Sequence, residues 1–378
     1  MKRLFFVAGE SSGDQHGAHL IRALRDMDPE VQCEGLGGQE MAAAGMALHF
    51  DLAGHAIMGF TEVLQSLKMI RRLFKDTLAR FDASRPDALV LIDYPGFNLR
   101  LARAAHSRGI PVIYYISPQI WAWKRGRLRT IARLVRKMLV ILPFEKELYE
   151  QAGVDCVYVG HPLLDHIPTV QIDGTLRGGL IIGLLPGSRQ QEIQRLLPVM
   201  LETARGIRTR YPQARFVTPS VNPEREAQIR TLAGEFPLEV LVGKMYEVLD
   251  AARFCLVASG TATLETALFG VPLAVLYKVS YLSYWIARSL VRVKHISLVN
   301  ILSGKGIVPE FIQHEASPER VLPAALELIE DGPARRQMLD DLAGMRLALG
   351  GGGASRCAAT EILNVIGEAR HDRTPVPD

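Results

Sequence analysis

The stretch Leu4-Phe5-Phe6-Val7-Ala8-Gly9-Glu10-Ser11-Ser12-Gly13-Asp14 joins a short apolar run, a turn of small residues and the start of a helical pattern. Glycines allow a tight turn, and the first N–H groups of a helix are free to hold a ligand. An equally open interpretation is a structural turn in which Asp14 caps the helix. The Gly-x-Gly-x-x-Gly spacing of dinucleotide sites is missing, which argues against a nicotinamide cofactor.

The same unit of strand and helix recurs along the chain. The apolar runs are rich in Val, Ile and Leu and do not alternate with polar residues, which is typical of parallel strands buried on both faces. The runs are Leu4–Ala8, Ala88–Ile92, Val112–Ile116, Lys137–Ile141, Cys156–Val159, Leu180–Leu185, Arg215–Pro219, Glu239–Val242, Phe254–Ala258 and Pro272–Leu276. Amphipathic helical patterns over 14–26, 61–82, 98–107, 125–135, 144–152, 189–210, 223–234 and 261–269 separate them.

This alternation predicts two doubly wound α/β domains, each with a parallel sheet. We expect them at residues 1–165 and 175–345, divided where proline and glycine cluster between Pro162 and Gly179. Helices follow from residue 318, interrupted by Gly350-Gly351-Gly352-Gly353. The last helix, 354–370, is expected to pack back on the N-terminal domain.

Composition excludes several classes of protein. The 378 residues are 48% hydrophobic and 22% charged, which is ordinary for a globular protein, and the net charge of +4 is spread evenly. The four cysteines lie far apart, which argues against a zinc site and for reduced thiols. The apolar run after Lys2 and Arg3 is too short for a signal peptide, and no run approaches a membrane span. We therefore expect a cytoplasmic location.

Two turns in the second domain are suited to a diphosphate. Leu184-Leu185-Pro186-Gly187-Ser188-Arg189 leads from a strand into a helix, and an Arg189 guanidinium there can pair with two phosphate oxygens. Ser259-Gly260-Thr261-Ala262-Thr263-Leu264-Glu265 repeats the arrangement, with free N–H groups at Gly260 and Thr261. Glu265 could accept hydrogen bonds from two ribose hydroxyls. The alternative is a pair of small-residue helix starts with Glu265 as a cap.

Asp93 is a candidate general base because it ends a predicted strand in Ile92-Asp93-Tyr94-Pro95-Gly96-Phe97-Asn98. Ligands of open α/β sheets bind outside the carboxyl ends of the strands. The alternative is that Asp93 caps the helix at 98. Asp26-Met27-Asp28 matches the Asp-x-Asp of metal-dependent sugar transferases but ends a helix before Pro29, so we interpret it as a solvated turn and predict no metal site.

Three basic segments carry interfacial aromatic residues. The helical pattern over 64–81 has one apolar face and exposes Lys68, Arg71, Arg72 and Lys75. Residues 94–144 contain no Asp or Glu, and their basic residues follow Trp121 and Trp123; acidic residues are also absent between Thr266 and Pro309. This composition favours an anionic membrane surface or a phosphorylated amphiphile. The alternative is that these helices pack on the sheet with solvated arginines. No RNA-binding signature occurs, so no nucleic-acid partner is expected.

The motifs together resemble lipid-A-disaccharide synthases, in order, from about residue 3 to 365. They are Ala8 to Asp14, Met58-Gly59 with Glu62-Val63-Leu64, Ile92 to Asn98, Ser117-Pro118-Gln119-Ile120-Trp121-Ala122-Trp123, Gly160-His161-Pro162-Leu163, Leu185 to Arg189, Ser259 to Glu265 and Ile307 to Gln313. The Ser-Pro-Gln-x-Trp-Ala-Trp run is the most particular of them. Val299 and Tyr281 stand where the family pattern has proline.

The resemblance implies a GT-B fold, with two Rossmann-like domains and a cleft between them. The N-terminal domain would bind the acceptor and its lipid, and the C-terminal domain the UDP-sugar. The reaction would be an inverting transfer, without metal or cofactor, from UDP-2,3-diacylglucosamine to 2,3-diacylglucosamine 1-phosphate (lipid X). Its products would be the beta-1,6-linked lipid A disaccharide 1-phosphate and UDP.

The resemblance also suggests roles for particular residues. Asp93 would be the base, with Glu10, Asp14 and His16 as its rivals. The residues expected at UDP are Ser188, Arg189, Gly260, Thr261, Glu265, Asn300 and Gln313. The residues expected at the acceptor lipid or membrane surface are Lys68, Arg71, Arg72, Lys75, Trp121 and Trp123. The enzyme would work peripherally at the anionic inner leaflet of the inner membrane, and a homodimer is compatible with the family.

Two other functions fit parts of this pattern. A UDP-GlcNAc transferase or 2-epimerase would share the fold but lack the amphipathic helix 64–81 and the Trp121/Trp123 segment. A non-catalytic lipid-binding module would need neither Arg189 nor Glu265 and would not bind UDP.

Overall fold

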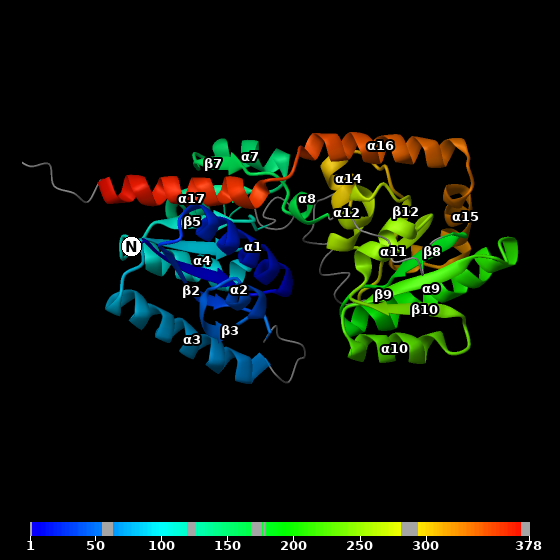
Figure 1. Ribbon diagram of the computed structural model, residues 1–378, viewed down its shortest axis with the longest axis horizontal. Helices are drawn as coiled ribbons and strands as arrows, with labels where there is room; N and C mark the ends of the chain where they lie inside the picture. Colours follow the sequence, from blue (N-terminus) through cyan, green and yellow to red (C-terminus); the bar gives the residue numbers. More distant parts are fainter. Residues whose placement is uncertain are drawn as a thin grey trace, which may run out of the picture. The chain divides into compact units, whose positions relative to one another are not determined.

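A computed structural model of the protein describes residues 2–54, 63–118, 126, 128–167, 176, 178–280 and 294–371. The chain divides into two compact units, shown in Figure 1. The first comprises Met1–Asp165 with Gly351–Asp378, and the second comprises His166–Gly350. Trp121, Trp123 and Tyr281 lie outside the described residues, whereas Val299 is buried.

The first unit is built on a parallel sheet of seven described strands in the order β3-β2-β1-β4-β5-β6-β7. These strands are β1 (Lys2–Ala8), β2 (Val31–Gly37), β3 (Ala47–Asp51), β4 (Ala88–Ile92), β5 (Val112–Tyr115), β6 (Lys137–Val140) and β7 (Cys156–Tyr158). Its helices are α1 (Ser11–Met27), α2 (Gln39–Ala43), α3 (Val63–Ala83), α4 (Pro95–His106), α6 (Leu128–Leu134), α7 (Pro143–Glu150) and α17 (Ala354–His371), with α8 (Leu163–His166) at the boundary.

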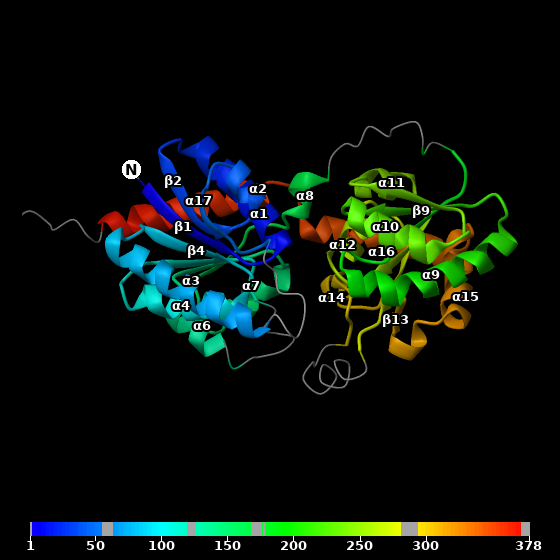
Figure 2. The ribbon, with the colours of Figure 1, turned by 90° about the horizontal axis from the view of Figure 1, so that it is seen from below.

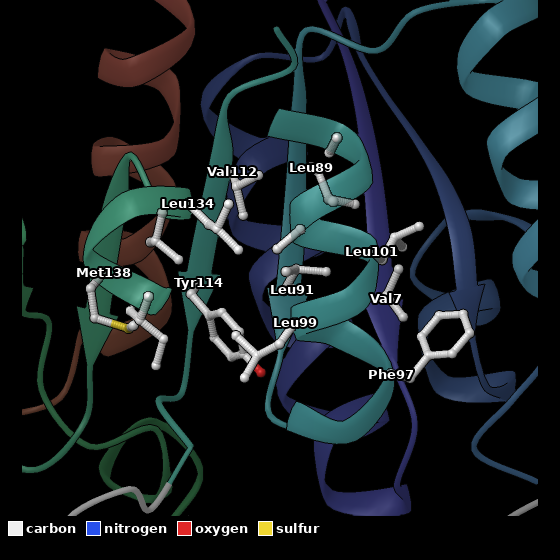
Figure 3. Close-up of a cluster of buried hydrophobic side chains, with 14 of the residues drawn as sticks. Val7, Leu89, Leu91, Phe97, Leu99, Leu101, Val112, Tyr114, Leu134 and Met138 are labelled. Carbon is white, nitrogen blue, oxygen red and sulfur yellow. The ribbon is translucent and has the colours of Figure 1, made fainter. Parts of the chain in front are cut away.

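Helices cover both faces of this sheet. In Figure 2, α3, α4 and α6 lie on one face, and α1 and α17 lie on the other. The core under α4 and α6 contains Leu89, Leu91, Tyr114 and Met138, drawn in Figure 3. Burial on both faces explains why β4 and β5 contain only apolar and aromatic residues.

The second unit repeats the plan with six described parallel strands in the order β10-β9-β8-β11-β12-β13. They are β8 (Ile181–Leu185), β9 (Arg215–Ser220), β10 (Leu238–Val242), β11 (Phe254–Ala258), β12 (Leu273–Tyr277) and β13 (Glu310–Ile312). Its helices are α9 (Gln190–Arg210), α10 (Pro223–Ala233), α11 (Met245–Ala251), α12 (Thr261–Leu268), α14 (Leu298–Ser303), α15 (Pro318–Ile329) and α16 (Pro333–Leu349).

The predicted fold class, two parallel sheets under helices, is therefore confirmed. Local rules explain many helix starts: proline, which lacks an N–H and has a helical φ, is the first residue of α4, α7, α10, α15 and α16. The sequence patterns missed β2, β3 and β13, and the short helices α2, α8, α11 and α14.

Candidate active site

In each sheet there is one pair of neighbouring strands from which the chain connections run in opposite directions. The loops at Gly9 and Asp93 follow this pair in the first sheet, and the loops at Arg189 and Gly260 follow it in the second. In the first sheet this pair is β1 and β4, which run side by side from Leu4↔Ala88 to Ala8↔Ile92. In the second it is β8 and β11. Loops that follow such a pair diverge and leave room for a ligand at the carboxyl edge.

Asp93 follows β4 at this edge of the first sheet, in an unusual backbone conformation. Asp93 and Tyr94 both have positive φ, 44° and 45°. Burial and the nearby Glu10 carboxylate raise the pKa of Asp93 to about 6, against the opposing effect of the Tyr94 N–H. A carboxylate with a raised pKa at such an edge is suited to accept a proton near neutral pH. Asp93 does not cap α4, because Tyr94 holds that position.

Glu10 lies across from Asp93 on the neighbouring loop. It occupies the N-cap position of α1, and its charge is close enough to raise the pKa of Asp93. Gly9 permits this approach: a Cβ added there would lie 2.4 Å from the Tyr94 ring. The structure thus brings Glu10 and Asp93 together, as expected for two residues at one edge.

The other two rival bases lie in different surroundings. Asp14 is 6% exposed, and its carboxylate accepts hydrogen bonds from the N–H groups of Gly38 (2.8 Å), Glu40 (3.0 Å) and Met41 (3.1 Å). It therefore caps α2, and the alternative interpretation, in which Asp14 caps its own helix, does not hold because α1 begins three residues earlier, at Ser11. His16 is half-buried near His161, whose pKa is lowered to about 3 by burial and by His16.

In the second unit, Arg189 stands at the N-cap position of α9. Its N–H donates to Glu192 Oε2 and its Nη1 to Glu192 Oε1, both at 3.2 Å. Gly187 precedes it with φ 104°, and a Cβ there would lie 2.4 Å from Glu192 Oε2, so glycine is required. Ser188 and Arg189 are exposed. The guanidinium is thus tethered at one end but accessible to an anion.

The second turn follows β11, the strand next to β8, and leads into α12. Gly260 is the N-cap residue of α12, and Gly260 and Thr261 are exposed. One turn inside the helix, Glu265 accepts a hydrogen bond of 3.2 Å from the Tyr246 hydroxyl. Burial raises the pKa of Glu265, although this hydrogen bond lowers it. Tyr246 escaped the sequence analysis because α11 is short; its ring stacks on Phe269, with centroids 5.5 Å apart.

Asn300 and Gln313 make hydrogen bonds within the fold. The Asn300 amide donates to Val308 O (2.9 Å) and Glu310 Oε1 (2.8 Å), and its oxygen accepts from the N–H groups of Ile307 and Val308. Gln313, with φ 54°, pairs with the backbone N–H and carbonyl of Val279. The Asn300 side-chain amide therefore uses its hydrogen-bonding capacity within the fold, where it holds this loop, and its role at UDP stays a prediction.

The basic residues of α3 lie on its outer side. Lys68, Arg71, Arg72 and Lys75 are exposed, and Arg72 lies 3.8 Å from Asp76. On the opposite side Leu73 is buried in the core, with Ile70, Phe74 and Leu78 packed against it. The apolar face of α3 is thus covered by protein over these residues, as in the alternative that the helix packs on the sheet, and the basic face remains exposed.

Within the described ranges, no group of three or more His, Cys, Asp and Glu side chains is placed to hold a metal ion. Asp28, the last residue of the Asp-x-Asp sequence, pairs with Lys2 at 2.8 Å. Among the residues that the structure describes, no helix is long and apolar enough to cross a membrane.

Solved structures share this architecture at low sequence identity. UDP-GlcNAc 2-epimerase from Neisseria meningitidis bound to UDP-GlcNAc has a TM-score of 0.66 and is 15% identical, covering 96% of this chain and 100% of that one. The calicheamicin glycosyltransferase has a TM-score of 0.60 and is 14% identical, covering 97% and 99%. These likenesses show the fold, which is of the GT-B type.

Sequence comparisons show the family. The model of lipid-A-disaccharide synthetase matches residues 4–360. The lipid-A-disaccharide synthase of Syntrophus aciditrophicus is 46% identical over 375 residues, covering 97% of this chain and 98% of that protein. That of Nitrosococcus oceani is 43% identical over 371 residues, covering 96% of both. The chain therefore belongs to the lipid-A-disaccharide synthase family and is a glycosyltransferase of lipid A biosynthesis.

Proposed function

We propose that this glycosyltransferase joins UDP-2,3-diacylglucosamine to 2,3-diacylglucosamine 1-phosphate and releases the beta-1,6-linked disaccharide 1-phosphate and UDP. The observation that carries the proposal is the pair of exposed turns, at Arg189 and Gly260, on neighbouring strands of the second sheet. A guanidinium and the N-terminus of α12 on adjacent loops suit the diphosphate of a nucleotide sugar. Glu265 lies one turn inside α12, where it would accept hydrogen bonds from the ribose.

The reaction would proceed by direct displacement. The acceptor 6-hydroxyl forms a bond to the anomeric carbon on the side opposite UDP, as the bond from that carbon to the diphosphate oxygen breaks. Asp93 would take the hydroxyl proton, which requires its ionised form. Since the pKa of Asp93 is about 6, we expect the rate to rise with pH through this value.

The leaving UDP carries the negative charge that develops in the transition state. Arg189 and the N–H groups at the start of α12 would stabilise it, because charge-assisted and dipole interactions strengthen as charge accumulates. Glu10 would act by keeping the pKa of Asp93 raised. The acceptor site would therefore involve the first unit and the donor site the second.

Both substrates are acylated, so the enzyme must take them from a membrane surface. The exposed cations Lys68, Arg71, Arg72 and Lys75 of α3 support peripheral binding to an anionic leaflet, here the cytoplasmic face of the inner membrane. Because the apolar face of α3 packs on the core, its contribution would be electrostatic.

Mass spectrometry of the product tests the substrates directly. The enzyme is incubated with both acylated sugars, with either one alone, and with UDP-GlcNAc replacing the acylated donor. We expect the acylated disaccharide 1-phosphate only when both acylated substrates are present. Coupling of unacylated UDP-GlcNAc at a similar rate, or UDP release without a disaccharide, would contradict the proposed substrates.

A further inference from the structure

Asp93 and Tyr94 form an unfavourable pair of backbone conformations. Two consecutive residues with a Cβ lie in the left-handed region, at φ 44° and 45°. Non-glycine residues visit this region singly and rarely, because the Cβ approaches the backbone. Such a conformation persists only where the surroundings hold it, and it is common where a side chain must be aimed. The contacts that hold Asp93 are therefore informative.

Two buried side chains hold the carbonyl of Asp93. The Asn98 amide, on the first turn of α4, donates to Asp93 O at 2.7 Å and to Ile92 O at 3.2 Å. The Tyr114 hydroxyl, on β5, donates to Asp93 O at 2.5 Å. Both residues are 0% exposed. Figure 3 shows Tyr114 near Leu99 within the core under α4, so its ring is fixed by packing.

The Tyr94 side chain is also held by close contacts. Its ring lies over Gly9, where an added Cβ would approach within 2.4 Å, and is tilted against Phe97 with centroids 6.3 Å apart. The backbone of Asn98 closes the turn by donating to Tyr94 O at 3.1 Å. Contacts from β1, α4 and β5 thus converge on this dipeptide.

We propose that Tyr114 and Asn98 are positioning residues, which lock the peptide after Asp93 in its left-handed conformation and so aim the Asp93 carboxylate at the acceptor hydroxyl. This inference rests on the proposed role of Asp93 as the base. Both side chains donate to the main-chain carbonyl of Asp93, and through it they act on the carboxylate. Without them the dipeptide relaxes to an ordinary conformation, and the carboxylate moves away from Glu10 and from its buried position.

A purely structural role makes a different prediction. Buried carbonyl groups need donors in any protein, so losing the Tyr114 hydroxyl would lower stability whatever Asp93 does. If the role of Tyr114 were only structural, the loss of its hydroxyl would leave the pH dependence of the reaction unchanged. Burial and the Glu10 carboxylate raise the pKa of Asp93, and the Tyr94 N–H lowers it; all three effects are sensitive to a shift of this turn.

Tyr114→Phe removes the hydroxyl and keeps the ring, and Tyr115→Phe is its matched control. Tyr115 is the next residue of β5, is equally buried and lies on the other face of the sheet. For Tyr114→Phe we expect kcat to fall about 10- to 100-fold, the scale of a misaimed catalytic group, with little change in KM. The acid limb of the kcat profile should move from about 6 toward the ordinary value of 3.8. Tyr115→Phe should alter neither.

A double-mutant cycle separates this inference from the role of Asp93 itself. If Asp93→Asn keeps wild-type activity, Asp93 is not the base and the proposed mechanism fails. If Asp93→Asn is impaired, we expect Tyr114→Phe to cause no further loss in that background, because its effect passes through Asp93. An undiminished loss in that background, or kcat of Tyr114→Phe within twofold of wild type, would overturn the positioning role.

Gly9→Ala gives an independent measurement if Tyr114→Phe folds poorly. Its added methyl group displaces the Tyr94 ring from the opposite side of the dipeptide. We expect the same signature, a lower kcat with the acid limb shifted to lower pH. A folded Gly9→Ala enzyme with a normal pH profile would show that the dipeptide conformation does not aim Asp93.

Discussion

Arg189 keeps 67% of its side chain exposed although it donates to Glu192. An exposed ion pair of this kind contributes little to stability, so folding alone does not explain a cation at this turn. By contrast, Asp14 and Asn300 use their polar atoms to hold backbone N–H and carbonyl groups. Arg189 precedes α9, Asp14 lies in the first turn of α1 and Asn300 lies in α14, and the family resemblance placed all three at the site. The hydrogen-bond partners distinguish them, and a single sequence does not reveal which N–H groups a distant segment will present.

Arg189→Ala should slow the transfer by about 10²–10³, equivalent to roughly 2–4 kcal/mol of lost transition-state stabilisation. The reason is that the guanidinium would oppose the charge developing on the departing diphosphate. Steady-state rates with both acylated substrates measure this effect. Arg208→Ala is the control, since Arg208 is an exposed arginine on the same helix, far along from the turn. A folded Arg189→Ala enzyme within twofold of wild type would exclude Arg189 from this role.

Strands with continuous apolar runs could be predicted from the sequence most directly. β4 and β11 are buried at every residue and were found. β2 alternates buried and exposed residues at its start and contains Gly35 and Gly37, and the residues of β3 at the sheet edge are only partly buried or exposed. β13 is an edge strand of three residues, which is too short to show a pattern. The search for doubly buried strands therefore recovers the centre of each sheet and two edge strands, β7 and β10, but misses β2, β3 and β13.

The amphipathic pattern of α3 predicted a helix, but it did not indicate what its apolar face contacts. Periodicity shows that one side is apolar, and both a protein core and a membrane satisfy that requirement. Ile70 and Phe74 pack against the core, so in the proposed attachment of α3 to a membrane the contribution that remains is that of charge. Electrostatic attachment weakens as salt increases, whereas inserted apolar residues hold at high salt.

Changing Lys68, Arg71, Arg72 and Lys75 together to Glu should leave the protein folded, because all four are exposed. At about 1 kcal/mol for each cation near an anionic leaflet, affinity for anionic liposomes should fall at least about 100-fold. Cosedimentation at low salt measures this, with neutral liposomes for comparison. The control changes Arg205, Arg208 and Arg210 on α9 to Glu, which alters charge on the second unit. Undiminished cosedimentation of the α3 variant would show that another surface meets the membrane.

At the scale of the whole molecule, the chain leaves the first unit after Asp165 and returns to it at Gly351. Asp165 joins these two places, because its carboxylate accepts hydrogen bonds from the N–H groups of Gly353, Ala354 (3.0 Å) and Ser355 (2.8 Å) at the start of α17. These bonds lower the pKa of Asp165 although burial raises it. The cap comes from a residue about 190 positions away, a pairing that no local pattern in the sequence indicates.

If the second unit neutralises the diphosphate by itself, a prediction about divalent cations follows. The net charge of the chain is only +4, so general attraction is a weak means of neutralising a diphosphate. In the proposed mechanism Arg189 and the N–H groups at Gly260 and Thr261 supply that neutralisation locally. If they suffice, a metal ion has no step to perform. We therefore expect the rate in excess EDTA to equal the rate in magnesium.

The measurement is the initial rate of UDP release after exhaustive chelation, with magnesium or manganese then added back. Arg189→Ala is assayed in parallel, because a metal that bridged the diphosphate would matter most where the guanidinium is missing. An unchanged wild-type rate supports neutralisation by the protein. Loss of activity in EDTA with recovery on adding either metal would mean that an ion shares the diphosphate charge with Arg189, and the roles given to Arg189 and the start of α12 would then need revision.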